Sequence, residues 1–503
     1  MTISNRSTYL KANPQRFRQS TFCELFKETV SLYPDKIAVK EGKRQLTYRE
    51  LEAKTNCLAH ALAEAGIASG EIVGIAAGQS ICSVVAMIGI WKAGGAYTYI
   101  DYNYPEATKA RIVSECQCRL VLDQSFYQNM DYTRDDPIDR SQRDGLAVLI
   151  YTSSTTASPK GVMIEHRNVM ASIGNFGRFD LTDDDIYAIF PSFSFVASVF
   201  DLYAALCLGC TAVIIPRKVR RHIDALQAFY KEEAVTITFL PPHMAVKFQK
   251  IDDGQTKLRL LIVGSEMARN LKKASYRILN VYGSSELTAM IAAYEISDTR
   301  SAYPIGRLNN DIRGYVRGYV VDESGAPVPA GEAGELWLAS EQVARGYLHN
   351  EEKTAAHFIR NPFSDEPAFR WLYKSGDIVR ADGDGIYHYV CRKDNMVKIR
   401  GFRVEIDEVE RQMRQYSSIG EVCVKSFTDS GGTNILCGYF EADTTLDVKA
   451  VKAFLNKKMP YYMVPTALFQ VESLPRTPSG KIARRAIQAP AEINDHRLLK
   501  ERY

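Results

Sequence analysis

Short, continuously apolar runs that alternate with helix-length segments constrain the fold of this 503-residue chain more than any other feature. These runs lie at Ile72–Ala76, Leu146–Ile150, Thr211–Ile215, Thr236–Leu240 and Leu258–Val263. Strands that are apolar on both faces are typically covered by helices on both sides, as in parallel sheets. We therefore predict an α/β fold in which mixed or parallel sheets are flanked by helices.

Two segments predict helices with clear boundaries. In Leu46–Gly66, Thr47 and Glu50 have the spacing of a capping box, apolar residues recur at helical spacing, and Gly66 suits the position after the helix end. Ile81–Lys92 predicts a second, strongly apolar helix. Helices between apolar runs agree with the α/β prediction.

A change of pattern near residues 391–403 indicates a domain boundary, since the chain is too long for one compact core. Beyond it, Glu405–Gln415 and Leu446–Lys458 predict helices, and Val422–Ser426 and Ile435–Phe440 predict strands. We expect a large domain over residues 1–393 and a small α+β domain over residues 394–503.

Composition excludes several function classes. The net charge of +4 is too small to indicate nucleic acid or an anionic membrane. The first residues lack the apolar core of a secretory signal, and the longest apolar stretch is about half a membrane span. Cys207 and Cys210 form a CxxC without a second ligand pair, which favours buried thiols over a metal site. We expect a soluble, cytoplasmic protein with neither a nucleic-acid nor a membrane partner.

The segment Tyr151–Val162, YTSSTTASPKGV, has the composition of a loop that wraps nucleotide phosphates. Hydroxyl and backbone N–H groups donate to phosphate oxygens, and a lysine supplies positive charge. Four further segments follow it in the chain: VYGSSE at Val281–Glu286, YKSGD at Tyr373–Asp377, RKDNMVKIRGFRVE at Arg392–Glu405 and PRTPSGK at Pro475–Lys481.

In this order and at these separations, the five segments resemble the core motifs of the adenylate-forming enzymes. The closest resemblance is to stand-alone amino-acid adenylation domains of nonribosomal peptide synthesis and to D-alanine–carrier-protein ligases. It implies a large N-terminal adenylate-forming domain, residues 1–393, that binds ATP and the acyl group. It also implies a mobile C-terminal lid, residues 394–503, that carries Lys481 and rotates about a hinge at Asp394.

The resemblance assigns nucleotide and metal roles. Tyr282 would stack on adenine, Asp377 would accept from the ribose hydroxyls with Arg392 beside it, and Glu286 would bind Mg²⁺ through a hard carboxylate oxygen. The implied catalytic residues are Lys481, Glu286, Thr155 and Lys160. The implied nucleotide contacts are Thr152, Ser153, Ser154, Thr155, Thr156, Lys160, Gly264, Ser265, Glu266, Tyr282, Gly283, Ser284, Ser285, Asp377, Arg392 and Lys481.

The phosphate loop departs from the family pattern at two positions. Ser154 and Ala157 stand where the pattern has glycines, which allow positive φ and a close approach of the backbone to phosphate. A stiffer loop that binds pyrophosphate less well is the expected consequence.

The implied acyl pocket also departs from the pattern. Family members that activate α-amino acids carry an aspartate for the ammonium group, and Val196 stands at that position here. A valine cannot pair with an ammonium ion, which leaves three interpretations: an acid without an α-amine, an amino acid whose amine binds elsewhere, or lost selectivity. The implied pocket residues are Phe195, Val196, Ala197, Phe200, His243, Leu261, Val263, Val281, Ala289 and Met290.

The predicted function is ATP-dependent adenylation of a carboxylic acid, with ATP and Mg²⁺ as cofactors, in secondary-metabolite biosynthesis. The acid would be an amino acid or an amino-acid-like, hydroxy or aryl acid. The acyl-AMP would then be transferred to the phosphopantetheine thiol of a separate carrier protein. One alternative is an acyl- or aryl-CoA ligase that uses free coenzyme A. The other is a catalytically degenerate homologue that serves as a binding or scaffold subunit.

Overall fold

The structure is a computed structural model that describes residues 9–10, 13–152, 160–308, 316–394, 396–429, 433–476 and 482–490. The chain forms two compact units. The first comprises residues 1–101, 115–151 and 161–393, and the second comprises residues 102–114, 152–160 and 394–503.

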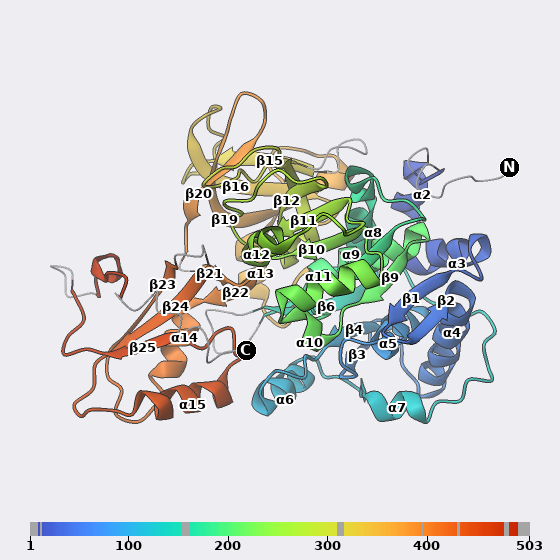
Figure 1. The fold of residues 1–503 in the computed structure, drawn as a ribbon, viewed down its shortest axis with the longest axis horizontal. Coiled ribbons are helices and arrows are strands. Elements are labelled where there is room, and N and C mark those ends of the chain that lie inside the picture. The colour runs from blue at the N-terminus through green and yellow to red at the C-terminus, as the bar shows by residue number, and fades with distance from the viewer. Residues whose placement is uncertain are drawn as a thin grey trace. The chain divides into compact units, whose positions relative to one another are not determined.

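The largest sheet of the described chain has nine strands and belongs to the first unit (Figure 1). Its order is β14 (Arg307–Leu308), β13 (Ala289–Glu295), β12 (Arg277–Ser284), β11 (Leu260–Gly264), β10 (Ile237–Leu240), β8 (Ile186–Ile189), β9 (Thr211–Ile214), β1 (Ile37–Glu41) and β2 (Arg44–Thr47). The strands from β12 to β1 run parallel, and β2, β13 and β14 are antiparallel to their neighbours.

The two faces of this sheet pack into different apolar clusters, because successive side chains of a strand point to opposite sides. On β11, Leu260 and Ile262 join the cluster that includes helix α9 (Ala197–Leu208). Leu261 and Val263 join the cluster formed with α11 (Ile223–Glu232) and α12 (Pro242–Ile251). Burial on both faces explains why these strands are continuously apolar.

Two further sheets lie mainly in the first unit. One has the order β17 (Gly346–Tyr347), β7 (Lys160–Glu165), β6 (Leu146–Thr152), β4 (Ala96–Tyr99), β3 (Ile72–Ile75) and β5 (Leu120–Leu122). The other is antiparallel, with the order β15 (Val316–Val321), β16 (Ala333–Ser340), β19 (Trp371–Ala381) and β18 (Phe358–Arg360), and with β20 (Tyr387–Arg392) paired to β19.

The other helices of the first unit lie mostly beside the nine-stranded and six-stranded sheets (Figure 1). They are α2 (Pro14–Gln19), α3 (Phe22–Leu32), α4 (Tyr48–Glu64), α5 (Ile81–Lys92), α7 (Gln124–Gln128), α8 (His166–Ile173), α10 (Arg217–Arg220) and α13 (Glu351–His357). The predicted capping box is confirmed, since Thr47 and Glu50 exchange hydrogen bonds at the start of α4. The predicted strands appear within one or two residues of the expected bounds, and the α/β class is confirmed.

The second unit includes most of α6 (Glu106–Glu115) and the C-terminal part of the chain. There, β23 (Val422–Thr428), β24 (Asn434–Phe440) and β25 (Ala467–Gln470) form one sheet, and β21 (Met396–Ile399) and β22 (Phe402–Glu405) form a hairpin. Helices α14 (Ile406–Met413) and α15 (Val448–Lys458) share an apolar cluster with these strands. This content is the α+β type that the sequence predicts for residues after 394.

In the described part of the chain, no helix combines the length and apolarity needed to cross a membrane. Cys207 and Cys210 are fully buried thiols, as the sequence predicts.

Candidate active site

A partly buried polar cluster joins three of the predicted nucleotide-binding residues. The Tyr282 hydroxyl donates to Asp377 Oδ2 at 2.5 Å, and Arg392 Nη1 donates to Asp377 Oδ1 at 3.0 Å. Only 8% of Asp377 is exposed. Burial and the neighbouring carboxylate raise the pKa of Tyr282 well above its usual value, so its phenol remains a donor.

The register of one hairpin creates the Asp377–Arg392 pair. The two residues are cross-strand partners on β19 and β20, which places their side chains on the same face. Gly376 precedes Asp377 with a φ of +72°, and a Cβ there would lie 2.9 Å from an Arg392 nitrogen. Glycine therefore permits both the left-handed backbone and the close approach of the guanidinium group.

The Asp377 backbone is also fixed by its neighbours. Its N–H donates to Ser375 Oγ at 3.0 Å, and the Ser375 hydroxyl donates to the Leu336 carbonyl on β16 at 2.6 Å. Arg392 Nη1 also donates to the Ser375 carbonyl at 2.7 Å. Asp377 therefore belongs to a hydrogen-bonded sheet and not to an isolated turn.

The second group is the turn that follows β12. Glu286 lies in a short 3₁₀ helix, Ser285–Leu287, and is fully buried. The chain then passes through Thr288 and Ala289, both at positive φ, into β13. Gly283 allows this reversal, since a Cβ there would lie 1.7 Å from the Ala289 carbonyl oxygen. Ser284 and Ser285 connect Gly283 to Glu286 within the same turn.

Glu286 is held by a segment that the sequence interpretation missed. The Tyr347 hydroxyl donates to Glu286 Oε1 at 2.9 Å, and the Ala344 N–H donates to the Glu286 carbonyl at 2.9 Å. Gln342 reaches the same turn through its side-chain amide. No periodicity or spacing marks these residues, because they lie some sixty positions away in sequence.

Gly264, Ser265 and Glu266 follow the carboxyl end of β11, beside β12. Gly264 is the register partner of Val281, and a Cβ on Gly264 would lie 2.7 Å from the Val281 side chain. Ser265 has a φ of +69°. The ends of adjacent parallel strands therefore bring this segment next to the one that carries Tyr282.

The predicted phosphate loop connects β6 to β7. Thr152 ends β6, and Lys160 begins β7 with its side chain buried. Ser153, Ser154, Thr155, Thr156 and Ala157 lie outside the described residues, as does Lys481. Asp394, the predicted hinge, is the first residue of the long C-terminal segment of the second unit.

The predicted acyl-pocket residues lie on both faces of the nine-stranded sheet. Val196, Phe200, Ala289 and Met290 belong to the α9-side cluster, and Val281 packs against it. Leu261 and Val263 are fully buried in the α11–α12 cluster on the other face of the sheet. His243 lies near the start of α12, and Phe195 and Ala197 flank Val196. The structure therefore gathers five of the ten side chains in one apolar environment.

Among the described residues, no group of three histidine, cysteine, aspartate or glutamate side chains is arranged to hold a metal ion. Glu286 instead offers a single carboxylate. Mg²⁺ in nucleotide sites is commonly held by one or two carboxylates, with the substrate phosphates and water completing its shell. Glu286 fits that smaller requirement.

The chain is similar to several known proteins. The family model described as AMP-binding enzyme matches residues 26–348. Bacitracin synthase 1 of Bacillus licheniformis is 32% identical, over 93% of this chain and 9% of its own length. Tyrocidine synthase 1 of Brevibacillus parabrevis is 31% identical, over 93% of this chain and 45% of its own length. The chain thus spans less than half the length of either synthase.

Two solved structures illustrate the shared fold. NpsA-ThdA, an artificially fused adenylation–PCP di-domain from Klebsiella oxytoca, matches with a TM-score of 0.81 and 24% identity, over 90% of this chain and 93% of that one. A double mutant of o-succinylbenzoate CoA synthetase (MenE) from Bacillus subtilis matches with a TM-score of 0.78 and 17% identity, over 92% of this chain and 98% of that one.

Proposed function

Because this chain belongs to the AMP-binding enzyme family, we propose that it is an ATP-dependent, AMP-forming ligase of the adenylation type that activates a carboxylic acid for transfer to a carrier protein. The observation that carries this proposal is the partly buried Tyr282–Asp377–Arg392 cluster beside the β11 and β12 strand ends. A rigid carboxylate with a cationic partner suits recognition of vicinal ribose hydroxyls.

The proposed reaction has two steps. In the first, a carboxylate oxygen of the substrate attacks the α-phosphorus of ATP, the bond to the β-phosphate breaks, and acyl-AMP and pyrophosphate form. In the second, a phosphopantetheine thiolate attacks the acyl carbonyl, a thioester forms, and AMP leaves. Positioned cations stabilise the charge that builds on phosphate oxygens, which is the role proposed for Lys160 and Lys481.

Glu286 is the residue proposed to hold Mg²⁺. Mg²⁺ held there would supply positive charge that neutralises part of the charge on the ATP phosphates. Glu286 itself contributes a buried, oriented carboxylate, because the Tyr347 hydroxyl fixes one of its oxygens. Mg²⁺-dependent ATP binding is the corresponding expectation.

The proposed substrate is an acid without an α-ammonium group in the usual position. Val196 is 5% exposed and lies among apolar side chains that include Phe200 and Met290. Burying an ammonium ion there without a carboxylate would cost several kcal/mol. A hydroxy, keto or aryl acid avoids that cost, as does a β-amino acid whose ammonium group binds elsewhere. His243 offers a polar partner for a hydroxyl or keto group.

Acid-dependent ATP–pyrophosphate exchange tests this proposal. We expect a signal with one class in a panel of amino, β-amino, hydroxy, keto, aryl and short fatty acids, and loss of that signal in Lys481→Ala. Val196→Asp should raise exchange with α-amino acids relative to other acids. An unchanged ratio would refute the role of Val196, and silence across the panel despite ATP binding would favour the degenerate homologue.

The acceptor separates carrier loading from CoA ligation, and MenE, one of the proteins that share this fold, is a CoA synthetase. We expect thioester formation on a phosphopantetheinylated carrier protein at lower acceptor concentration than on free coenzyme A. The reverse preference would favour the acyl-CoA ligase.

A further inference from the structure

The turn that carries Glu286 requires support from outside itself. Thr288 and Ala289 have φ values of 48° and 78°, which residues other than glycine and asparagine seldom adopt. Such a backbone persists only where surrounding contacts over-determine it. The orientation of Glu286 therefore depends on the residues that hold this turn.

Gln342 supplies much of that support. Its side chain is fully buried, and Nε2 donates to the carbonyls of Leu287 at 3.1 Å and Met290 at 2.9 Å. Its Oε1 accepts from Asn175 Nδ2 at 3.0 Å, and its backbone carbonyl accepts from the Thr288 hydroxyl at 2.8 Å. One amide thus bridges both ends of the strained turn, and a satisfied buried polar network specifies a single geometry.

Tyr347 acts on Glu286 directly. Its hydroxyl donates to Oε1 at 2.9 Å, while the nearby Ala344 N–H donates to the Glu286 carbonyl at 2.9 Å. Both Glu286 and Tyr347 are buried, so this bond is shielded from competing water. The side chain and the backbone of Glu286 are therefore both bound by residues 342–347.

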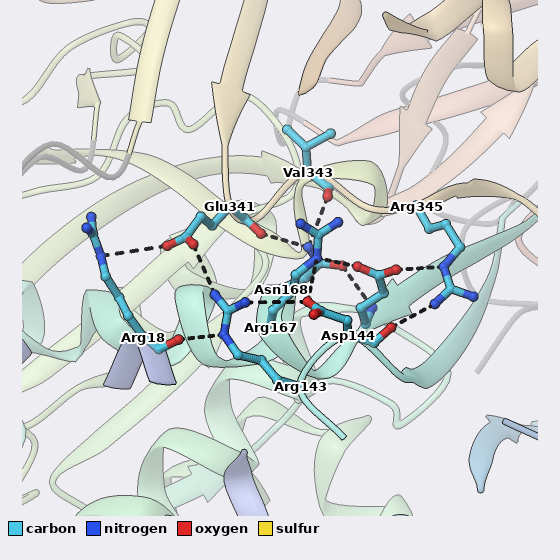
Figure 2. Close-up of polar contacts among 9 residues, drawn as sticks. Arg18, Arg143, Asp144, Arg167, Asn168, Glu341, Val343 and Arg345 are labelled. Atoms are coloured by element: carbon cyan, nitrogen blue, oxygen red, sulfur yellow. Dashed lines mark hydrogen bonds and ion pairs between the residues drawn. The ribbon is translucent and has the colours of Figure 1, made fainter. Parts of the chain in front are cut away.

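Residues 341–345 are in turn anchored to the rest of the first unit by the network in Figure 2. Asn168 Nδ2, at the start of α8, donates to the carbonyls of Glu341 at 2.7 Å and Val343 at 3.0 Å. Arg345 Nε donates to Glu165 Oε1, at the end of β7, at 2.6 Å.

The Glu341 carboxylate completes this anchor. It lies between Arg18 and Arg143, and Arg143 Nη2 donates to it at 3.1 Å (Figure 2). Hydrogen bonds and charged contacts thus hold the segment that binds Glu286 at several points, which makes it a rigid support.

We propose that Tyr347 and Gln342 are positioning residues for Glu286: they fix its carboxylate in the orientation that Mg²⁺ bound to ATP requires. This inference rests on the proposed function of Glu286. Tyr347 orients the side chain, and Gln342 holds the turn, including Ala289 and Met290 of the predicted acyl pocket.

The test compares ATP dissociation constants measured by calorimetry in Mg²⁺ and in EDTA, so it needs no acid substrate. In the parent protein we expect Mg²⁺ to tighten ATP binding, and Glu286→Gln should abolish this gain. Tyr347→Phe removes one oxygen, and we expect the gain to fall about tenfold while the affinity in EDTA stays unchanged. Tyr276→Phe, a buried tyrosine of the α11–α12 cluster, is the matched control and should behave as the parent.

Gln342→Met keeps the side-chain length and removes the amide, and it should lose the Mg²⁺-dependent gain as well. If this variant fails to fold by circular dichroism, Tyr347→Phe decides alone. A full gain in Tyr347→Phe, beside its loss in Glu286→Gln, would overturn the inference and leave the role of Glu286 intact. No Mg²⁺-dependent gain in the parent would instead refute the proposed function of Glu286, and the inference with it.

Discussion

His166 makes the stability of the first unit depend on pH. It is the first residue of α8, is 2% exposed, and packs edge-on against Trp91 with ring centroids 5.0 Å apart. Burial lowers the pKa of His166 to about 3, from the ordinary value of 6.5. The folded protein therefore keeps this imidazole neutral, whereas the unfolded chain binds a proton below pH 6.5.

The sign and size of the effect follow from this difference. Because the unfolded state binds the extra proton, the free energy of unfolding has its full value above about pH 6.5 and falls as the pH decreases toward 3. Each pH unit inside that window is worth about 1.4 kcal/mol, so the loss between pH 7 and pH 5 is about 2 kcal/mol. His166→Gln removes this contribution at every pH.

Tryptophan fluorescence during urea unfolding measures the effect, since Trp91, Trp337 and Trp371 all lie in the first unit. We expect the unfolding free energy of the parent to fall by about 2 kcal/mol more than that of His166→Gln between pH 7 and pH 5. His222→Gln, at an exposed position before α11, should follow the parent. Parallel pH profiles for the parent and His166→Gln would refute the reasoning, whatever their offset.

Two further predictions follow from buried carboxylates. Asp377→Asn should weaken ATP binding about tenfold by calorimetry, because its charge-assisted bond from Arg392 is lost; unchanged affinity would remove Asp377 from the nucleotide site. Burial raises the pKa of Asp201 to about 7 from 3.8, although the Tyr187 hydroxyl donates to it at 2.7 Å. Folding therefore favours its protonated form, and stability declines as the pH rises through this window. Asp201→Asn should gain about 3 kcal/mol relative to the parent between pH 5 and pH 8 in urea unfolding, and a constant difference would contradict this.

Much of the fold could be predicted because its signals are local. The Thr47–Glu50 capping box and the apolar runs of the strands need only neighbouring residues to be recognised. The apolar run places the start of β11 two residues early, at Leu258. Arg259 lies before the strand and pairs with Asp185 on a distant segment. That contact exists only in the folded chain.

Part of the candidate site can likewise be predicted from local sequence, and part cannot. Asp377 and Arg392 lie on one hairpin, so a motif and a register are enough to bring them together. The separation of Leu261 and Val263 from Val196 by the sheet depends on which face each strand residue takes in the tertiary fold. The contact between Glu286 and Tyr347 joins the turn between β12 and β13 to β17, a strand of a different sheet, and no local pattern predicts it.

The contrast between motif residues and their distant supporting residues helps to distinguish an active member of the family from a degenerate one. On the roles proposed for Glu286 and Asp377, a chain that keeps both residues in their motifs would still lose Mg²⁺-dependent nucleotide binding if the distant support of the Glu286 turn were lost. The orientation of Asp377 depends less on distant residues, because its partner Arg392 and its backbone contacts lie within β16, β19 and β20. Gln342 and Tyr347 are therefore more informative than the motif residues themselves, since they report whether the Glu286 carboxylate is still held. Both are present here, together with the hydrogen bonds that anchor their segment, which argues against the binding or scaffold homologue.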